Sequence, residues 1–224
     1  MKTKKIVIVG DSAFAEIAHE YFDADTEYEV VAFAVELAYL KHQQLNGLPI
    51  VAFETLVETY PPAEHEVYVA TVYTQLNRLR TRLARAAKEH GYKLASYISP
   101  RAFVWRNVEI GEHCFIFEDN TLQPFVKIAN NAVLWSGNHI GHHSVIRDNC
   151  FIASQVVISG FCDIGENTFI GVNATLANNV TIGNDNWIGP NTVIMKNTEA
   201  GALYKTDQPE PSKISALRFF KIKE

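Results

Sequence analysis

This 224-residue chain has few cysteines, no excess of basic residues and no long hydrophobic run. Its three cysteines, a small and odd number, give no sign of a disulfide framework. The formal net charge of −5 excludes a general nucleic-acid binder, because such a protein needs a basic face. No apolar segment is long enough to span a bilayer, and Gly10 and Asp11 end the first apolar run too early for a signal peptide. We therefore expect a cytoplasmic protein without a membrane span.

Glycine is scarce where a dinucleotide-binding turn would need it. The segment IVIVGDSAFAEIA, residues 6–18, changes from a strand pattern to a helix pattern but contains only Gly10. The G-x-G-x-x-G fingerprint uses its glycines for a tight turn and for close approach of the backbone to pyrophosphate. We therefore do not expect bound NAD, whereas another phosphate-bearing ligand at this helix start is compatible with the sequence.

Strand and helix patterns alternate in the first part of the chain. Apolar runs predict strands over 4–10, 28–35, 66–72 and 92–98, and helical spacing predicts helices over 13–21, 53–60 and 75–91. This alternation predicts a Rossmann-like α/β domain over residues 1–99, with a parallel sheet between two layers of helices. Such sheets bind ligands at the carboxyl ends of their strands.

After Pro100 the pattern changes to a six-residue repeat. Sixteen successive positions, every sixth residue from Val104 to Ile194, are aliphatic. The residue three positions later is often asparagine, which tolerates the left-handed backbone of a tight corner: Asn107, Asn131, Asn149, Asn167, Asn173, Asn179, Asn191 and Asn197. Such units must stack to bury their aliphatic residues. The repeat predicts an all-β domain over residues 100–199, a left-handed parallel β-helix with eighteen residues per coil.

The register also assigns the cysteines and the tail. Cys114, Cys150 and Cys162 occupy the small position four residues after the aliphatic one, so we expect them in the core rather than in a reactive site. Residues 200–224 leave the repeat. We expect this tail, including SKISALRFFKIKE, to fold back and cap the open end of the solenoid.

The stretch WSGNHIGHHSVIRDN, residues 135–149, gathers three histidines: His139, His142 and His143. The phenylalanines eighteen residues before and after His143, Phe125 and Phe161, are expected to stack on it along one corner. For His143, an aromatic ladder and a functional role both remain open, and His139 is expected to face outward. The other histidines belong to no such group, so we expect them at the solvated surface: His19, His42, His65, His90 and His113.

His142 is the candidate catalytic base. It lies near a corner, outside the core, and the same position on the next coil is Gly160, which leaves open space beside the imidazole. A histidine near its unperturbed pKa can accept a proton at cytoplasmic pH. A free backbone N–H at Gly160 would stabilise an oxyanion. On the following coils this position is Asn178 and then Lys196, which we assign to the coenzyme.

The quoted histidine stretch and its continuation resemble a known family. The segments GNHIGHHSVIRDNCFIASQVVISG, residues 137–160, and IGENTFIGVNATL, residues 164–176, resemble bacterial nucleotide-sugar acetyltransferases with a Rossmann-like domain and a left-handed β-helix. The resemblance implies that His142 is the general base. It also implies that acetyl-CoA lies between two subunits of a homotrimer, against the backbone near Gly160, Val172 and Gly189. Trp135 and Trp187 flank the coil faces and favour such side-by-side packing.

The resemblance also implies that the N-terminal domain holds the nucleotide sugar. The residues that it assigns to this role are Gly10, Ser12, Phe14, Glu36, Tyr73, Asn77 and Arg78. Some relatives have a carboxylate directly after the base, where this chain has His143, and some have a further histidine at the position of Phe151. The group that orients His142 is therefore not identified by the resemblance.

Metal chemistry is the competing interpretation of the histidines. The γ-class carbonic anhydrases share this β-helix and bind zinc through three histidines, but their pattern has one histidine far upstream of a pair spaced five apart. The three close histidines of this chain do not match that spacing, so no metal is expected.

We therefore expect an acyltransferase that moves the acetyl group of acetyl-CoA to a nucleotide-linked amino sugar, a 4-amino-4,6-dideoxyhexose, for a surface glycan such as lipopolysaccharide. Direct attack is expected, since no exposed cysteine or serine is paired with the base. Two alternatives remain open: a sugar O-acetyltransferase of the same fold, and a non-catalytic trimer that binds sugar nucleotides.

Overall fold

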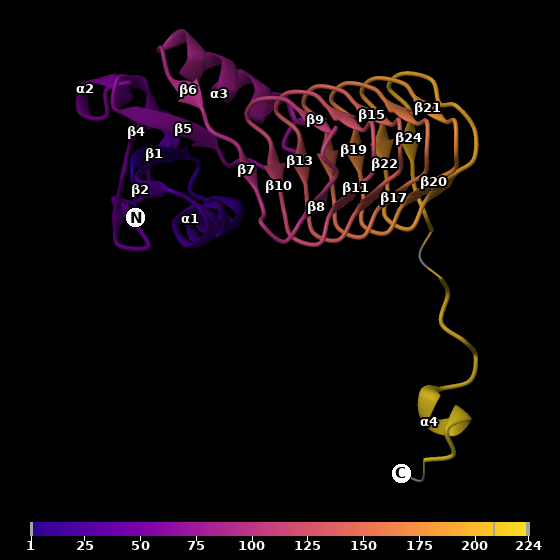
Figure 1. The fold of residues 1–224 in the computed structure, drawn as a ribbon. Coiled ribbons are helices and arrows are strands. Elements are labelled where there is room, and N and C mark those ends of the chain that lie inside the picture. Colours follow the sequence, from indigo (N-terminus) through magenta and orange to yellow (C-terminus); the bar gives the residue numbers. More distant parts are fainter. Residues whose placement is uncertain (1, 208, 223–224) are drawn as a thin grey trace.

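The computed structural model describes residues 2–207 and 209–222 and contains two packed parts, an N-terminal α/β domain and a long β-helix (Figure 1). The sheet of the first part has the order β3-β4-β2-β1-β5-β6, and its pairs are parallel except β3–β4. Its strands are β1 (Lys4–Val9), β2 (Tyr28–Val35), β3 (Gln44–Leu45), β4 (Leu48–Ala52), β5 (His65–Val69) and β6 (Lys93–Leu94).

Helices cover both faces of this sheet, as the alternating pattern predicts. The helices are α1 (Ala13–Asp25), α2 (Leu56–Thr59) and α3 (Arg78–Glu89), with 3₁₀ turns η1 (Leu37–Tyr39) and η2 (Phe53–Thr55). Phe14 and Phe22 of α1 pack with Ile6 and Ile8 on one face. On the other face, apolar residues of α2 and α3 pack against β1 and β5.

The expected strand over 92–98 is wrong as a single strand. Its first half is β6 of the N-terminal sheet, whereas its second half, β7 (Tyr97–Ile98), pairs with the β-helix. The chain passes from one sheet to the other at Ala95 and Ser96. Ile98 lies six residues before Val104, so the repeat begins one unit earlier than the sequence analysis places it. The β-helix thus starts at Tyr97 rather than at residue 100.

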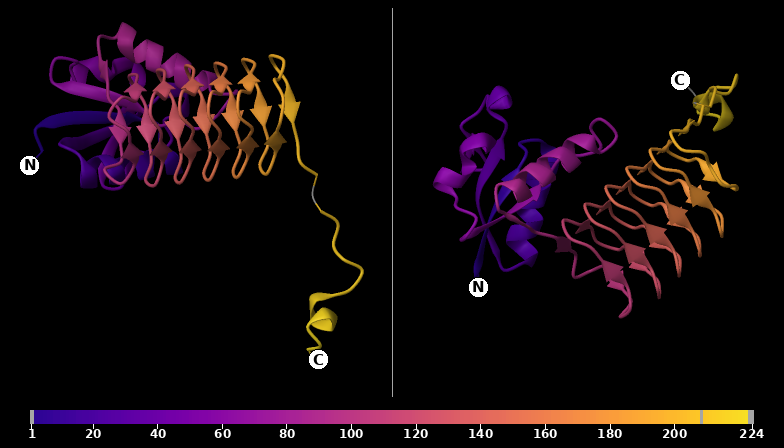
Figure 2. Two further views of the ribbon diagram at one scale, coloured as in Figure 1. Left: turned by 45° about the vertical axis from the view of Figure 1, so that its right-hand side comes forward. Right: turned by 90° about the horizontal axis from the view of Figure 1, so that it is seen from above.

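Three parallel sheets enclose the triangular β-helix (Figure 2). The first face contains β7, β10 (Phe115–Ile116), β13 (Val133–Leu134), β16 (Phe151–Ile152), β19 (Phe169–Ile170), β22 (Trp187–Ile188) and β24 (Leu203–Tyr204). The second face contains β8 (Phe103–Val104), β11 (Thr121–Leu122), β14 (His139–Ile140), β17 (Val157–Ile158), β20 (Thr175–Leu176) and β23 (Val193–Ile194). The third face contains β9 (Glu109–Ile110), β12 (Lys127–Ile128), β15 (Val145–Ile146), β18 (Asp163–Ile164) and β21 (Thr181–Ile182).

The repeat behaves as its register predicts. The sixteen aliphatic residues from Val104 to Ile194 pack in one continuous core that also contains Cys114, Cys150 and Cys162. Burial raises the pKa of the Cys150 thiol to about 12 and that of Cys114 to about 11, so these thiols stay protonated. The left-handed backbone at corners is confirmed for six of the eight expected asparagines: Asn131, Asn149, Asn167, Asn173, Asn179 and Asn191.

The N-terminal domain packs on the first face of the β-helix. Phe14 contacts Phe115 edge-on at 5.5 Å between ring centroids and Trp135 at 5.7 Å, and Tyr73 lies 5.6 Å from Trp187. The expectation that Trp135 and Trp187 favour contact between subunits is therefore wrong, because both pack against the N-terminal domain of their own chain.

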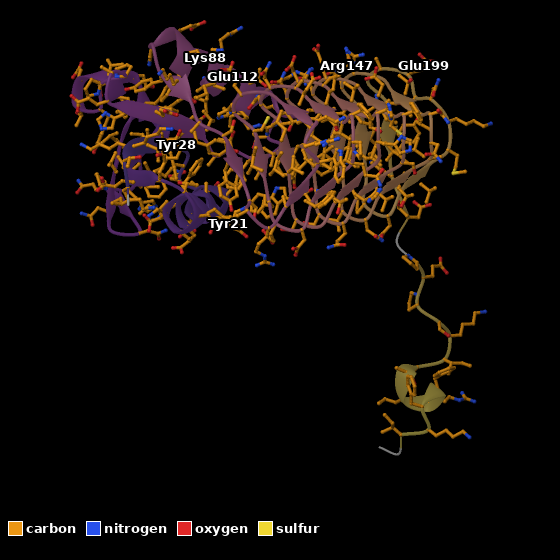
Figure 3. All side chains as sticks on the ribbon, in the orientation of Figure 1. Tyr21, Tyr28, Lys88, Glu112, Arg147 and Glu199 are labelled. Atoms are coloured by element: carbon orange, nitrogen blue, oxygen red, sulfur yellow. The ribbon has the colours of Figure 1, made fainter. Side chains whose placement is uncertain are left out.

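Polar contacts border this aromatic interface (Figure 3). Lys88 of α3 pairs with Glu112 of the β-helix. Tyr21 of α1 donates a hydrogen bond to Glu118 at 2.8 Å. Burial, followed by this hydrogen bond to a carboxylate, raises the pKa of Tyr21 to about 12. Charged side chains thus lie at the margin of the aromatic cluster that joins the two domains.

The expected C-terminal cap is also corrected. β24 adds one strand to the first face, and the Thr206 hydroxyl donates to the Pro190 carbonyl at 2.8 Å. Beyond it, the described residues 209–222 with α4 (Ala216–Phe219) extend away from the solenoid, and their side chains are exposed (Figures 1 and 2). The last coil is two residues shorter than the regular eighteen, since Trp187 pairs with Leu203, and the six-residue repeat does not continue into the tail. Residues 208, 223 and 224 lie outside the described part of the tail.

Candidate active site

His142 and His143 form the corner that follows β14, between the second and third faces. We call the histidine corner the set of residues 124–125, 142–143, 160–161 and 178–179, which share this position on successive coils. The ring of His143 is stacked between Phe125, at 4.5 Å and 27°, and Phe161, at 4.7 Å and 16°. The expected aromatic stack is confirmed. Its three residues have the left-handed backbone, with φ of 68° at Phe125, 59° at His143 and 60° at Phe161.

Gly160 leaves room for the His142 imidazole. A Cβ at Gly160 would lie 2.8 Å from Cε1 and 2.9 Å from Nε2 of His142, closer than real Cβ atoms approach another atom. The same ring meets Phe161 edge-on at 5.0 Å and 87°. The expected placement of a histidine beside a glycine is therefore what the structure has, and the glycine is required for it.

The two histidines contact each other directly. Their Nδ1 atoms are 3.1 Å apart, and their rings are nearly perpendicular, at 88°. The His142 backbone N–H donates to Gln123 Oε1 at 2.9 Å. Among the described residues no hydrogen-bond partner reaches His142 Nε2, so this nitrogen is the one available to a bound molecule.

The expectation that the backbone N–H of Gly160 is free is wrong. This amide donates to Asn178 Oδ1 at 2.9 Å, one coil further on. Glu112 and Glu166 have the same bond to Asn130 and Asn184, eighteen residues later in each case, so it is a regular corner feature. An asparagine eighteen residues later in the sequence predicts this hydrogen bond. His142 lacks this partner because Gly160 has no side chain, and Gln123 takes its place.

The expected coenzyme residues lie on two different corners. Lys196 is exposed and follows β23, so it continues the line of His142, Gly160 and Asn178. Val172, which is 49% exposed, and Gly189, which is buried and donates to the Tyr204 carbonyl at 2.8 Å, lie at the corner between the first and second faces. The second face separates these residues from His142, so one chain does not bring the two sets together.

A hollow lies in the N-terminal domain, at the carboxyl ends of β1, β2 and β5. It has a volume of about 320 Å³ and is lined by Val9, Gly10, Asp11, Ala34, Val35, Glu36, Tyr39, Thr71, Thr74, Gln75, Leu79, Arg82 and Leu83. Gly10 is needed there, because its φ is +130° and a Cβ would lie 2.8 Å from the Ala70 carbonyl oxygen. This edge is where the parallel sheet predicts a ligand.

Arg82 is the main residue of this hollow that the sequence analysis missed. Its guanidinium makes two hydrogen bonds to Glu36, at 2.7 and 2.8 Å, and holds the pKa of that carboxyl below its ordinary value. No local sequence pattern indicates Arg82, because its place in the hollow depends on how α3 lies against the end of β2. Glu36 itself is placed in the hollow as expected.

Two of the expected substrate residues are wrong, because the structure buries both. Phe14 is 2% exposed in the aromatic interface between the domains. Asn77 is fully buried, and its Nδ2 donates to the Asn167 carbonyl at 3.0 Å. Phe14 packs on aromatic residues of the β-helix and Asn77 donates a hydrogen bond to its backbone, so both residues join the two domains.

The remaining three are accessible to different extents. Ser12 is exposed at the N-terminus of α1 and makes no capping hydrogen bond with its side chain. Tyr73 is 41% exposed and packs 4.5 Å from Phe169. Arg78 forms an ion pair with Asp185 of the β-helix at 2.7 Å, so it is held at the domain boundary.

The solvated surface expected for His113 and His65 is wrong. His113 is 1% exposed, accepts a hydrogen bond from the Val69 backbone N–H at 2.9 Å and lies 2.7 Å from Asn131 Oδ1. Burial lowers its pKa to about 3, so it is neutral. His65 is 7% exposed and contacts the Pro61 carbonyl. His113 lies where the β-helix meets the N-terminal domain, a contact that the repeat register does not predict. His65 lies inside the N-terminal domain, at the start of β5, with its ring edge-on to Tyr60 at 5.3 Å.

Residues 2–207 and 209–222 contain no group of three or more histidine, cysteine or acidic side chains arranged to hold a metal ion. No helix within the same residues combines the length and apolar character needed to cross a membrane.

The structure combines a Rossmann-like domain with a six-residue-repeat β-helix that has a histidine beside a glycine at one corner. The family described as bacterial transferase hexapeptide (six repeats) matches residues 125–160 and again 143–178, which together contain His142, His143 and Gly160. A comparison with curated proteins gives no match.

Solved structures match most of the chain. The acetyltransferase domain of PglB from Neisseria gonorrhoeae has a TM-score of 0.81 at 22% identity, with 90% of this chain and 96% of that chain covered. PerB from Caulobacter crescentus, solved with CoA and GDP-perosamine, has a TM-score of 0.78 at 25% identity, with 89% and 92% covered. The expected left-handed β-helix and the resemblance to bacterial sugar acetyltransferases are confirmed at the level of the fold.

Proposed function

We propose that this chain is an acetyl-CoA-dependent N-acetyltransferase whose acceptor is a nucleotide-linked amino sugar, a 4-amino-4,6-dideoxyhexose used for a surface glycan such as lipopolysaccharide. The observation that carries the proposal is His142, whose Nε2 is open to a bound molecule beside Gly160. A base at this position suits the removal of a proton from an attacking amine.

The reaction is a direct transfer. The sugar amine attacks the thioester carbonyl, a C–N bond forms, the C–S bond breaks, and CoA leaves as its thiolate. His142 Nε2 accepts the proton that the nitrogen loses and gives it up to the thiolate, so that the thiol of CoA is released. The cysteines do not serve as acyl carriers, because all three are buried and burial raises the pKa of each thiol. Gly160 provides the room for the base, and its N–H can meet an oxyanion only after Asn178 releases it.

Relatives of the same fold support the substrate class. PerB is a perosamine N-acetyltransferase that has been solved with CoA and GDP-perosamine. The PglB acetyltransferase domain has been solved with acetyl coenzyme A. In this chain the hollow beside Gly10 and Glu36 is the proposed nucleotide-sugar site, with Ser12, Tyr73 and Arg78 near its margin. The Arg82 guanidinium would pair with a phosphate of the ligand there, after its hydrogen bonds to Glu36 break.

The position of His142 supports a homotrimer. The N-terminal domain packs on the first face, and the histidine corner is the edge between the other two faces, opposite it. A sugar held in the N-terminal domain therefore does not face His142 of its own chain. A neighbouring chain would complete the site, and the coenzyme would lie in the cleft between them, against Val172 and Gly189 of one chain and Lys196 of the other. Both co-substrates are cytoplasmic metabolites, so the proposal places the enzyme in the cytoplasm.

The test is release of thiol from acetyl-CoA with a panel of UDP-, GDP- and dTDP-linked amino sugars. We expect turnover with an amino-sugar acceptor, and a loss of ~10²–10⁴-fold in kcat for His142→Ala, the usual contribution of a general base. His42→Ala, an exposed histidine outside the histidine corner and the lining of the hollow, is the control and should keep wild-type kcat. Undiminished turnover in His142→Ala would contradict the assignment of the base.

The same assay separates the alternatives. Turnover with the corresponding hydroxy sugar but not the amino sugar would indicate an O-acetyltransferase. Calorimetric titration with acetyl-CoA tests the non-catalytic trimer, because binding of nucleotide sugar without binding of acetyl-CoA would favour it.

A further inference from the structure

The contact between the two corner histidines links the tautomer of His142 to that of His143. A neutral imidazole has one N–H donor and one acceptor nitrogen. Because the contact joins Nδ1 to Nδ1 at 3.1 Å, one ring must donate from Nδ1 and the other must accept at Nδ1. If His142 were the acceptor, its proton would be on Nε2, and the open nitrogen would have no lone pair for the substrate.

We infer that His143 is a positioning residue whose Nδ1 accepts a hydrogen bond from His142 Nδ1–H and so keeps the lone pair of His142 on Nε2. The inference rests on the proposed function, because it gives His142 the role of base. The imidazole of His143 takes the place of an orienting carboxylate. When His142 gains the substrate's proton, its Nδ1–H still has an acceptor, so the ring need not turn during the reaction.

The aromatic stack makes His143 a fixed acceptor. Its ring is held between Phe125 and Phe161 at 4.5 and 4.7 Å. The perpendicular His142 ring rests edge-on against Phe161 at 5.0 Å. An aromatic ladder alone would need only a third phenylalanine at 143. A histidine there adds the hydrogen bond to His142, and that bond distinguishes the positioning role from plain packing.

The repeat supplies two matched variants of His143. Phenylalanine already occupies this corner at 125 and 161 with φ of 68° and 60°, so His143→Phe keeps the stack and removes the acceptor. Asparagine occupies the equivalent left-handed position at Asn149 and Asn167 with φ of 64° and 58°. His143→Asn therefore suits the backbone, and its Oδ1 replaces Nδ1 as an acceptor while the ring is lost.

Steady-state kinetics test the inference. We expect His143→Phe to lower kcat by about 10- to 100-fold, the usual value of a partner that orients an imidazole, with KM for both substrates changed less than about 2-fold. His143→Asn should stay within about 5-fold of wild type, because it keeps the acceptor. In a His142→Ala background, His143→Phe should have no further effect, since it acts through His142. Full activity in His143→Phe, equal losses in the Phe and Asn variants, or additive losses in the double variant would each overturn the inference.

The tautomer of His142 gives a readout that does not depend on activity. Two-bond ¹H–¹⁵N correlation spectra of ¹⁵N-histidine-labelled protein distinguish Nδ1–H from Nε2–H, and the His142→Ala spectrum assigns the signal among the eight histidines. We expect Nδ1–H in wild type and His143→Asn, and a shift toward Nε2–H in His143→Phe. An Nε2–H signal in wild type would overturn the inference. If no sugar is acetylated but the Nδ1–H signal is found, the proposed function fails while the hydrogen bond stands.

Discussion

The guanidinium of Arg80, in α3, donates to the main-chain carbonyl of Asn149, in the β-helix, at 3.0 Å. Arg80 is fully buried and has no carboxylate partner among the described residues. Its other acceptors also come from both domains: the carbonyls of Thr71, Val72, Asn131 and Cys150 and the side-chain oxygens of Asn77 and Asn131. Burial lowers its pKa to about 10, which still leaves it charged at neutral pH. One buried cation thus joins the two domains.

Replacing Arg80 should destabilise the protein. Arg80→Met keeps most of the side-chain volume but leaves several buried carbonyls without a donor, so we expect the free energy of unfolding to fall by about 3 kcal/mol. Urea unfolding measures the change. Arg85→Met on the same helix is the control and should cost less than about 0.5 kcal/mol, because Arg85 is 74% exposed and pairs only with Glu89. Equal stability of the two variants would contradict the role given to Arg80.

The sequence predicts the β-helix well because each residue's place depends only on its number in an eighteen-residue coil. The buried cysteines and the stack of Phe125, His143 and Phe161 both follow from that count. The packing of the N-terminal domain on the first face does not, because it joins segments far apart in the chain. The expectations for Trp135, Phe14 and His113 are therefore wrong, because the contacts of these residues cross from one domain to the other.

In the candidate site, too, the sequence predicts features that the repeat sets but not contacts between distant segments. Periodicity places His142 beside Gly160, and the asparagine eighteen residues after Gly160 could have predicted the bond to its N–H. Arg82 depends on how α3 lies against the end of β2, which no local pattern specifies. The acceptor sugar and the partner chain are not encoded in any repeat.

Buried His113 should make stability depend on pH. Its pKa falls from the ordinary value of 6.5 to about 3, chiefly by burial, so between these values the unfolded chain binds a proton that the folded chain does not. Stability therefore falls as pH falls through this window, by about 1.4 kcal/mol per pH unit from this one group. Urea unfolding at pH 6, 5 and 4 should show a slope that is smaller by about this amount in His113→Asn.

The control for that slope is His42→Asn, an exposed histidine that is solvated in both states. We expect it to leave the pH dependence unchanged. If His113→Asn and His42→Asn gave the same slope as wild type, His113 would not be the group responsible.

Removal of the tail should have little effect on folding. The described residues after 208 are exposed, including Leu217, Phe219 and Phe220, and the last hydrogen bonds of the solenoid are made by Thr206. A chain that ends at Asp207 should unfold within about 1 °C of the full chain, since no buried contact is lost. Circular dichroism during heating measures this. A fall of several degrees would restore the capping role that the sequence alone predicts for the tail.

Adding one methyl group at Gly160 should impair catalysis more than folding. In Gly160→Ala the new Cβ would lie 2.8 Å from His142 Cε1, so the imidazole must move, while the backbone at 160 is not in the left-handed region and accepts alanine. We expect kcat to fall by about 10²-fold, the usual cost of misplacing a catalytic group by about 1 Å, with a melting temperature close to that of wild type. In a His142→Ala background the same methyl group should have no effect on kcat, because the ring that it displaces is absent. A loss that persists in that background would mean that Gly160 acts on the substrate itself, through its backbone or the space above it, rather than through His142.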